Sequence, residues 1–479
     1  MHKTKQTATC TRHVCWRARY KHLLRTVNYG TINQLCLVRP INLRKKADKS
    51  VVREGQVRYD LFWNYRRTRK SRRVCAKIFL DDEGKEVIDE TDLVAQMTLF
   101  WKRTKEEYSR DQVNFREINF DETIMQKTND IAFNGLKRWC TAPFTVGFVK
   151  RKAMELKNKK IMGNDLIPNA FIKIGTDVFF SVITGLFNKM FKNEILVSKK
   201  WKSAYGTMLN KEGVVCKLSG YRTIMVNCAM AKLYSKLIHH RLIVFFEKGK
   251  LLGENQQGSR RKRSTADNIF ILQQMREKQS LCKQPLFITF LDFSKAFDRV
   301  DRSLLYKILE KFGVPELVIS AIRKLYEGRT VKLKLGNVIT GELDYSAGVI
   351  QGDSLSPLLY IIFITVISQQ LNAAGNSMMC NHAGFVDDFV CIADSIVSAQ
   401  LGMDVVDRAT RQIGVICNFD KCKVMVENVD HHDKLYLRGF ELESVEQYKY
   451  LGITFRKGIC FLRLMGKGCV RNCQKRCGQ

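Results

Sequence analysis

The chain has 479 residues, of which 45% are hydrophobic and 27% are charged, as in soluble globular proteins with two or three domains. Its formal net charge of +34 indicates a polyanionic partner such as nucleic acid. The sequence shows no secretory signal and no run of 18 uncharged apolar residues, so we expect neither secretion nor a membrane span. Its 16 scattered cysteines are expected to stay reduced inside the cell.

The positive charge is unevenly distributed along the chain. Residues 1–80 hold 21 Lys and Arg against 3 Asp and Glu, residues 81–190 hold 17 of each, and residues 191–479 hold 43 against 27. No Lys or Arg occurs between Lys334 and Arg408. A basic periphery around a cation-poor centre is typical of a protein that grips a phosphate backbone and binds metal cations.

The N-terminal part divides into two segments. Residues 1–75 form a basic extension that is densest at Arg66–Arg73, for which a solvated tail, a nucleic-acid contact and a nuclear import signal all remain open. Residues 76–190 are predicted to be mainly helical, with helices at Asp92–Glu107 and Thr176–Phe191 after a strand at Val74–Leu80. The cysteines near the C-terminus lack paired spacing and histidine, so no zinc site is expected there.

Residues 191–457 alternate between strand and helix signals. We predict strands at Phe287–Asp292, Thr330–Leu335 and Lys423–Val426, and hairpins at Phe385–Ala393 and Tyr448–Phe455. We predict helices at Leu304–Phe312, Pro315–Tyr326, Ser354–Leu371 and Ser395–Cys417. Strands with two helices packed on one face define an α+β fold.

Two adjacent acids lie within the apolar hairpin. Val386-Asp387-Asp388-Phe389 is flanked by apolar residues on both sides, and a second apolar strand ends in Asp292. Adjacent carboxylates in such a setting lose hydration and repel one another, and a bound metal ion relieves both costs. Three carboxylates on neighbouring strands indicate a two-Mg²⁺ centre for phosphoryl transfer.

Further motifs appear in a fixed order around these acids. The series resembles the LINE-type (non-LTR) retrotransposon reverse transcriptases over roughly residues 145–457, and the matching segments are Lys160–Asp165, Trp201, Tyr221–Ile224, Asn255–Arg260, Asp292–Asp298, Gly348–Pro357, Val386–Phe389, Asn418–Lys423 and Tyr448–Ile453. The resemblance implies an RNA-directed DNA polymerase with a right-hand palm and fingers in residues 191–457. Its implied partners are an RNA template, a DNA primer or target and dNTPs, with no membrane. Its implied location is intracellular, nuclear with a cytoplasmic phase.

The resemblance also implies roles for the acids. Asp292 and Asp387 would bridge two Mg²⁺ ions (with Mn²⁺ as an alternative), and Asp388 would complete the metal site. Lys421 matches the lysine beside the leaving pyrophosphate and is a candidate general acid, and Lys423 remains open as an alternative.

Nucleotide-binding roles follow in the same way. Phe297 would exclude a 2′-hydroxyl, with ordinary core packing as the alternative reading. The backbone at Lys295 and Ala296 would face the triphosphate. Gln351 and Gly352 would lie beside the template and the incoming base. The cations Arg222 and Lys211 would contact the triphosphate, although Lys211 is nearly as well explained by a solvated face.

A basic turn is expected to hold the template. It consists of Arg260, Arg261, Lys262 and Arg263 and leads into a helix, and Ser259 stands before it where the family usually has an aromatic residue.

The ends of the chain depart from the family. Residues 458–479 are expected to be a truncated thumb, and no endonuclease is recognisable in residues 1–140. A catalytically silent nucleic-acid-binding remnant is therefore the alternative function.

Overall fold

The computed structural model describes residues 79–80, 86–87, 89–106, 131–157, 162–210, 217–378, 381–429 and 433–458. The chain divides into two compact units, Met1–Arg73 and Val74–Gln479, and every described residue belongs to the second. The predicted basic extension, all of the predicted thumb remnant except Gly458, and Lys211 lie outside the described residues.

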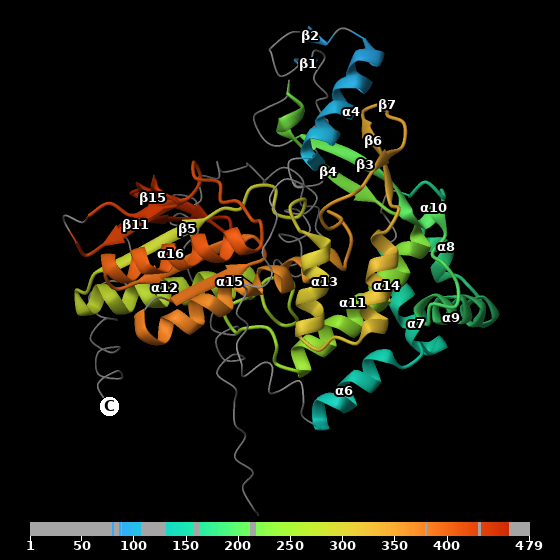
Figure 1. The fold of residues 1–479 in the computed structure, drawn as a ribbon, viewed down its shortest axis with the longest axis horizontal. Helices are drawn as coiled ribbons and strands as arrows, with labels where there is room; N and C mark the ends of the chain where they lie inside the picture. The colour runs from blue at the N-terminus through green and yellow to red at the C-terminus, as the bar shows by residue number, and fades with distance from the viewer. Residues whose placement is uncertain are drawn as a thin grey trace, which may run out of the picture. The chain divides into compact units, whose positions relative to one another are not determined.

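A five-stranded sheet, which we call the palm sheet, lies at the left of Figure 1. Its strand order is β14-β11-β5-β10-β9, and the strands are β5 (Leu286–Leu291), β9 (Asn381–Phe385), β10 (Asp388–Ala393), β11 (Lys423–Glu427) and β14 (Glu443–Ser444). β5 pairs antiparallel with both β10 and β11, so a strand from residues 286–291 lies between two strands that follow it by about a hundred residues or more.

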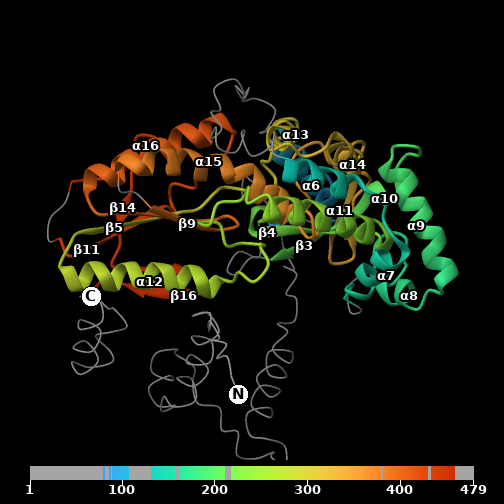
Figure 2. The same ribbon diagram turned by 90° about the horizontal axis from the view of Figure 1, so that it is seen from below.

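Alternate residues of β5 belong to the two opposite faces of the palm sheet. Phe287 and Leu291 join a large core that includes residues of α15 (Ser356–Met378) and α16 (Ile396–Gln412). Ile288 and Phe290 join a second core with α12 (Thr265–Cys282) and the hairpin of β15 (Gln447–Tyr450) and β16 (Ile453–Arg456). Figure 2 shows α15 and α16 on one face of the sheet and α12 on the other. The sheet is therefore buried on both faces.

Helix α15 is long and apolar because it lies inside the fold. Its segment Ser356–Ala374 has a mean hydropathy of 1.4 and the length of a membrane span, yet 67% of it is buried in the protein. It packs against α16, β9 and α13 (Arg302–Lys311), which agrees with the predicted core helix.

A second sheet, the fingers sheet, has the order β4-β3-β6-β7, with β8 also pairing with β6. Its strands are β3 (Ser203–Asn210), β4 (Tyr221–Val226), β6 (Thr330–Leu335), β7 (Val338–Ile339) and β8 (Leu343–Asp344). β6 pairs parallel with β3, although β3 precedes Asp292 in the sequence and β6 follows it. The fingers sheet draws on the chain on both sides of Asp292.

The remaining elements are helices and short strands outside the two five-stranded sheets. The helices are α4 (Glu90–Glu106), α6 (Ile131–Thr141), α7 (Val146–Met154), α8 (Asn169–Lys173), α9 (Asp177–Phe191), α10 (Lys199–Lys202), η3 (Leu218–Gly220), α11 (Ala229–Lys248) and α14 (Glu316–Tyr326). The short strands are β1 (Phe79–Leu80), β2 (Glu86–Val87), β12 (Tyr436–Leu437) and β13 (Phe440–Glu441).

Helix α4 is attached to the body of the unit by a buried cation. The Lys105 ammonium lies 3.0 Å from Oδ1 of Asp298 and donates to the carbonyl of Ala347 at 3.1 Å. It also lies 4.7 Å from the ring centroid of Trp101 and 4.3 Å from that of Tyr345. An ammonium removed from water needs such partners, and burial lowers its pKa despite the Asp298 carboxylate. This link joins α4 to the chain one residue after Phe297.

The predicted α+β class is confirmed, and the predicted strands and helices after residue 286 are present within a few residues. The helix predicted at Ser395–Cys417 ends earlier, at Gln412, because Gly414 takes a left-handed φ of 69° that stops helix propagation. The helix predicted at Ser354–Leu371 instead continues to Met378.

Candidate active site

Asp292 and Asp388 lie opposite one another at one end of the palm sheet. The last pair of the β5–β10 ladder is Leu291 and Phe389, and the next residue of each strand at that end is Asp292 and Asp388. Residues that face each other across antiparallel strands have Cβ atoms about 4.5–5.5 Å apart and point to the same face. The strand register thus brings together two acids that are 96 positions apart in the sequence.

Asp387 lies in the turn that joins β9 to β10. The turn begins at Val386, whose φ of 63° is left-handed. This conformation costs an L-residue on the order of 1–2 kcal/mol, and a β-branched side chain makes it rarer still. This backbone conformation lets two consecutive acids project from the tip of the hairpin.

The two acids of the turn hold their protons more tightly than free carboxyls do. Desolvation, followed by the charges of Asp387 and Asp292, raises the pKa of Asp388 to about 6. Desolvation and the Asp292 charge also raise the pKa of Asp387, and the Arg222 cation works in the opposite direction. Both side chains still contact solvent, so the negative charge is concentrated at an accessible position.

The donor chemistry of this site fits a hard divalent cation. Three carboxylates supply only oxygen donors, and a cation of charge +2 would relieve the repulsion that, together with desolvation, raises the pKa values of Asp387 and Asp388. Within the described residues, no three His, Cys, Asp or Glu side chains are drawn together closely enough to enclose an ion.

The backbone of Asp292 is held from behind by the segment before β11. Its N–H donates to Sγ of Cys422 at 3.5 Å, and its carbonyl accepts from the N–H of Asn418 at 2.8 Å. We did not single out Cys422 from the sequence, because a buried Cys without a metal-like spacing gives no signal for such a role.

The structure separates the two candidate general acids. Nζ of Lys421 lies 3.6 Å from Oδ2 of Asp292, and the Lys421 side chain is 65% exposed. Nζ of Lys423 instead donates to Oε2 of Glu443 at 2.6 Å. Lys421 is therefore the lysine that adjoins the acids.

Phe297 is half-buried and stacks on Tyr360, with ring centroids 5.1 Å apart and an interplanar angle of 14°. The charges of Asp387 and Asp292 contribute to a raised pKa of Tyr360, so this aromatic pair adjoins the acids. Ala296 is buried, and Lys295 is exposed with a left-handed φ of 46°. A tight turn therefore carries Phe297 from the end of β5 to Tyr360.

Gln351 and Gly352 join the palm to the fingers sheet. The carbonyl of Gln351 accepts from the N–H of Met225 in β4 at 2.8 Å. Gly352 has a φ of 107°, and a Cβ there would lie 3.0 Å from the carbonyl oxygen of Met225. Arg222, an exposed cation of the same strand, lies near enough for its charge to lower the pKa of Asp387.

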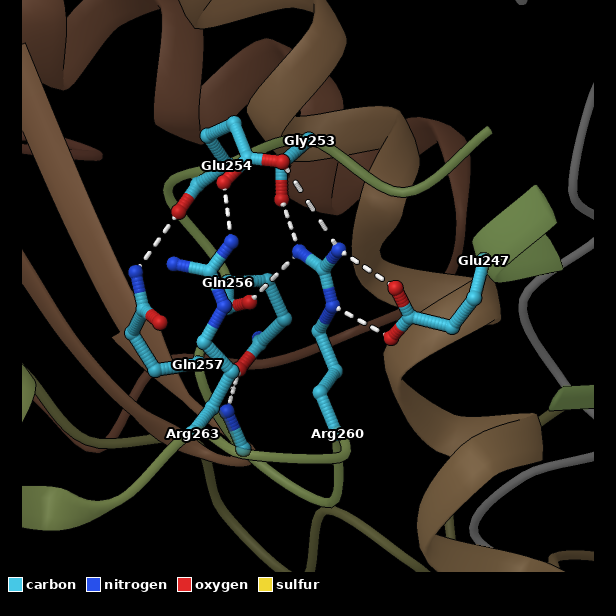
Figure 3. A network of polar contacts seen from close by, with 8 residues as sticks. Glu247, Gly253, Glu254, Gln256, Gln257, Arg260 and Arg263 are labelled. Atoms are coloured by element: carbon cyan, nitrogen blue, oxygen red, sulfur yellow. Dashed lines mark hydrogen bonds and ion pairs between the residues drawn. The ribbon is translucent and has the colours of Figure 1, made fainter. Parts of the chain in front are cut away.

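The four cations of the basic turn are not equivalent. Figure 3 shows the Arg260 guanidinium between the Glu247 carboxylate and the carbonyls of Gly253 and Gln256. Its side chain is only 4% exposed, so the predicted template contact needs correcting: Arg260 is engaged inside the protein. Of the others, Arg261 and Lys262 are exposed, and Arg263 pairs with Glu254.

Comparison with known proteins shows the family of the chain. Residues 209–455 match the family described as "Reverse transcriptase (RNA-dependent DNA polymerase)". The RNA-directed DNA polymerase from mobile element jockey of Drosophila melanogaster is 27% identical over 67% of this chain and 36% of its own length. The probable RNA-directed DNA polymerase from transposon X-element of the same fly is 28% identical over 52% of this chain and 27% of its own length. A polyprotein from its type-2 retrotransposable element R2DM is 27% identical over 40% of this chain and 19% of its own length.

The fold and site are those of a nucleic-acid polymerase palm with its fingers. The chain belongs to the reverse transcriptase family, and the predicted resemblance to the LINE-type enzymes is confirmed. The chain spans only about a third of the length of the jockey relatives that it matches.

Proposed function

We propose that residues 191–457 form an RNA-directed DNA polymerase that joins a dNTP to the 3′-hydroxyl of a primer on an RNA template. The observation that carries the proposal is the position of Asp388 opposite Asp292, with Asp387 beside it. These carboxylates would hold two Mg²⁺ ions, or Mn²⁺ as an alternative. Such ions, when bound, neutralise the triphosphate and favour ionisation of the primer hydroxyl.

The protein's own groups would bind and orient the substrates. Phe297, backed by Tyr360, would exclude a ribose 2′-hydroxyl from the sugar site. Arg222 would offset the charge of the triphosphate, and Gly352 would allow the base pair to approach the backbone. Lys421 would hold a proton near the departing pyrophosphate, since it already contacts Asp292.

The partners follow from the same chemistry. The family description and the names of the relatives support an RNA template, a DNA primer or target, and dNTPs as ligands. A mobile element that copies RNA into chromosomal DNA would act in the nucleus after a cytoplasmic phase. The net charge of +34 supports tight, salt-sensitive binding to such polyanions.

Primer extension with the purified full chain tests the proposal. The protein should extend a DNA primer on an RNA template with dNTPs and Mg²⁺. Asp387→Asn should abolish extension while template–primer binding is kept, and Asp404→Asn, on an exposed face of α16, should extend normally. If the unmutated protein bound template–primer and added no nucleotide, the silent-remnant alternative would replace the polymerase.

A further inference from the structure

The strained turn at Val386 is supported by a segment that runs beside β9, the edge strand of the palm sheet. The N–H of Val386 donates to Oε1 of Gln256 at 3.0 Å, and the same oxygen accepts from the N–H of Gly258 at 2.8 Å. Gln256 is 4% exposed, so this amide is isolated from water. One buried side-chain oxygen therefore fixes the residue that precedes Asp387.

Backbone bonds place the two segments side by side. Gly384 of β9 donates its N–H to the carbonyl of Asn255 at 2.8 Å, and its carbonyl accepts from the N–H of Gln257 at 2.8 Å. Gln256 and Gly384 thus form an isolated parallel bridge beside the hairpin. The Gln256 side chain reaches the turn from this fixed backbone.

Gly258 sets how closely the two segments approach. A Cβ at this position would lie 2.3 Å from the backbone nitrogen of Val386 and 2.9 Å from the carbonyl carbon of Phe385. Backbone atoms cannot move aside as a flexible side chain does, so any larger residue here would displace the turn.

Arg260 and its partners stiffen the supporting segment (Figure 3). The guanidinium donates to both carboxylate oxygens of Glu247 in α11, at 2.9 and 3.0 Å. It also donates to the carbonyls of Gly253 at 2.6 Å and of Gln256 at 3.0 Å. Paired, bidentate contacts of this kind restrict geometry strongly. Residues 253–260 are therefore anchored to α11 at the point where Gln256 meets the turn.

We propose that Gln256 is a positioning residue for the metal-binding carboxylates, because it holds the left-handed Val386 from which Asp387 and Asp388 project. The inference rests on the proposed function. Arg260 belongs to the basic turn that we expected to hold the template. Here it helps to support the catalytic turn. The supporting segment and the turn are more than 125 residues apart in the sequence, and backbone and amide contacts connect them.

Gln256→Met and Gln257→Met form a matched test. Both glutamines are buried, but the Gln257 amide donates to the carbonyl of Glu254, and among the described residues its side chain makes no hydrogen bond to the turn. Groups that orient metal ligands contribute about 10–100-fold to metal affinity. We expect Gln256→Met to weaken Mn²⁺ binding to the full chain, measured by electron paramagnetic resonance, by about tenfold relative to Gln257→Met. The Mg²⁺ concentration for half-maximal extension should rise in parallel, with template–primer affinity unchanged.

Gly258→Ala and Gly253→Ala provide a second pair, because a Cβ at Gly253 meets nothing within 4 Å. Gly258→Ala should reproduce the metal defect, and Gly253→Ala should bind Mn²⁺ as the unmutated protein does. Equal Mn²⁺ affinity within both pairs would overturn the inference, as would an unmutated protein that binds no Mn²⁺. A protein that bound Mn²⁺ but extended no primer would contradict the proposed function alone, since the binding comparison would still stand.

Discussion

Phe297 lies flat against Tyr360, with the ring centroids 5.1 Å apart and the planes within 14° of parallel. Tyr360 is fully buried in α15, and its hydroxyl has no hydrogen-bond partner among the described residues. Phe297 retains partial exposure, so one aromatic ring supports the other from inside the protein. This arrangement accommodates both readings of Phe297, because a residue can pack on the core and still present an edge to a nucleotide sugar.

Phe297→Ala distinguishes these two readings. We expect the variant to retain extension and to incorporate ribonucleotides at least about tenfold more readily relative to deoxynucleotides, because about 1.4 kcal/mol of steric exclusion corresponds to tenfold. The measurement is the ratio of kcat/KM for dNTP and rNTP. Phe179→Ala, which truncates a half-buried aromatic in α9, is the control and should leave the ratio unchanged. Full discrimination by Phe297→Ala would reduce Phe297 to core packing.

The raised pKa of Asp388, about 6 against an ordinary value of 3.8, predicts a pH effect on stability. Between these values the folded protein binds more protons than the unfolded chain, so the contribution of this group to the unfolding free energy falls as pH rises. Asp388→Asn removes this pH-dependent loss of unfolding free energy. In EDTA, the variant should melt higher than the unmutated protein at pH 7 and gain little near pH 4. A variant that melts lower at pH 7 would contradict the repulsion among the acids.

Lys421 and Lys423 make separable contributions to the rate. Lys421→Ala should lower the single-turnover rate of nucleotide addition by about 10²-fold, because a positioned general acid typically contributes that much. Lys423→Ala should change the rate little, since Lys423 pairs with Glu443 instead of Asp292. Rapid-quench kinetics with saturating dNTP measures both. A larger loss in Lys423→Ala would reverse the assignment.

The basic turn predicts different behaviour for neighbouring arginines. Arg261→Ala should lower the slope of log affinity against log salt by about 0.7–0.9, because one phosphate contact is lost. Arg260→Met should keep the slope and instead lower the melting temperature, since its guanidinium anchors Glu247 and two carbonyls. Fluorescence anisotropy with an RNA–DNA hybrid at several salt concentrations, together with thermal melting, checks both. A salt slope altered only by Arg260→Met would contradict these placements.

Local sequence pattern was sufficient for the elements that carry the acids. The apolar run before Asp292 and the apolar residues on both sides of Asp387 and Asp388 predicted β5 and the β9–β10 hairpin, because β5 is buried on both faces and the hairpin must turn at its charged tip. The order of motifs then identified their common site. The antiparallel register that sets Asp388 opposite Asp292 is a property of the folded sheet.

Contacts between distant segments could not be predicted in this way. Arg260 has the same appearance in sequence as Arg261, and only the position of Glu247 on α11 decides which of them is buried. Lys105 meets Asp298 across 193 positions, with no periodicity to reveal it. Gln256 was predicted only as part of the matching segment Asn255–Arg260, because nothing in its neighbours indicates the Val386 turn.

The most direct test of the shared metal site is anomalous diffraction from crystals of the full chain soaked in Mn²⁺. We expect Mn²⁺ peaks within coordination distance of Asp292 and Asp387, with Asp388 adjoining. Mn²⁺ bound by Asp387 and Asp388 with Asp292 uninvolved, or bound only elsewhere, would contradict a polymerase centre built from these three residues.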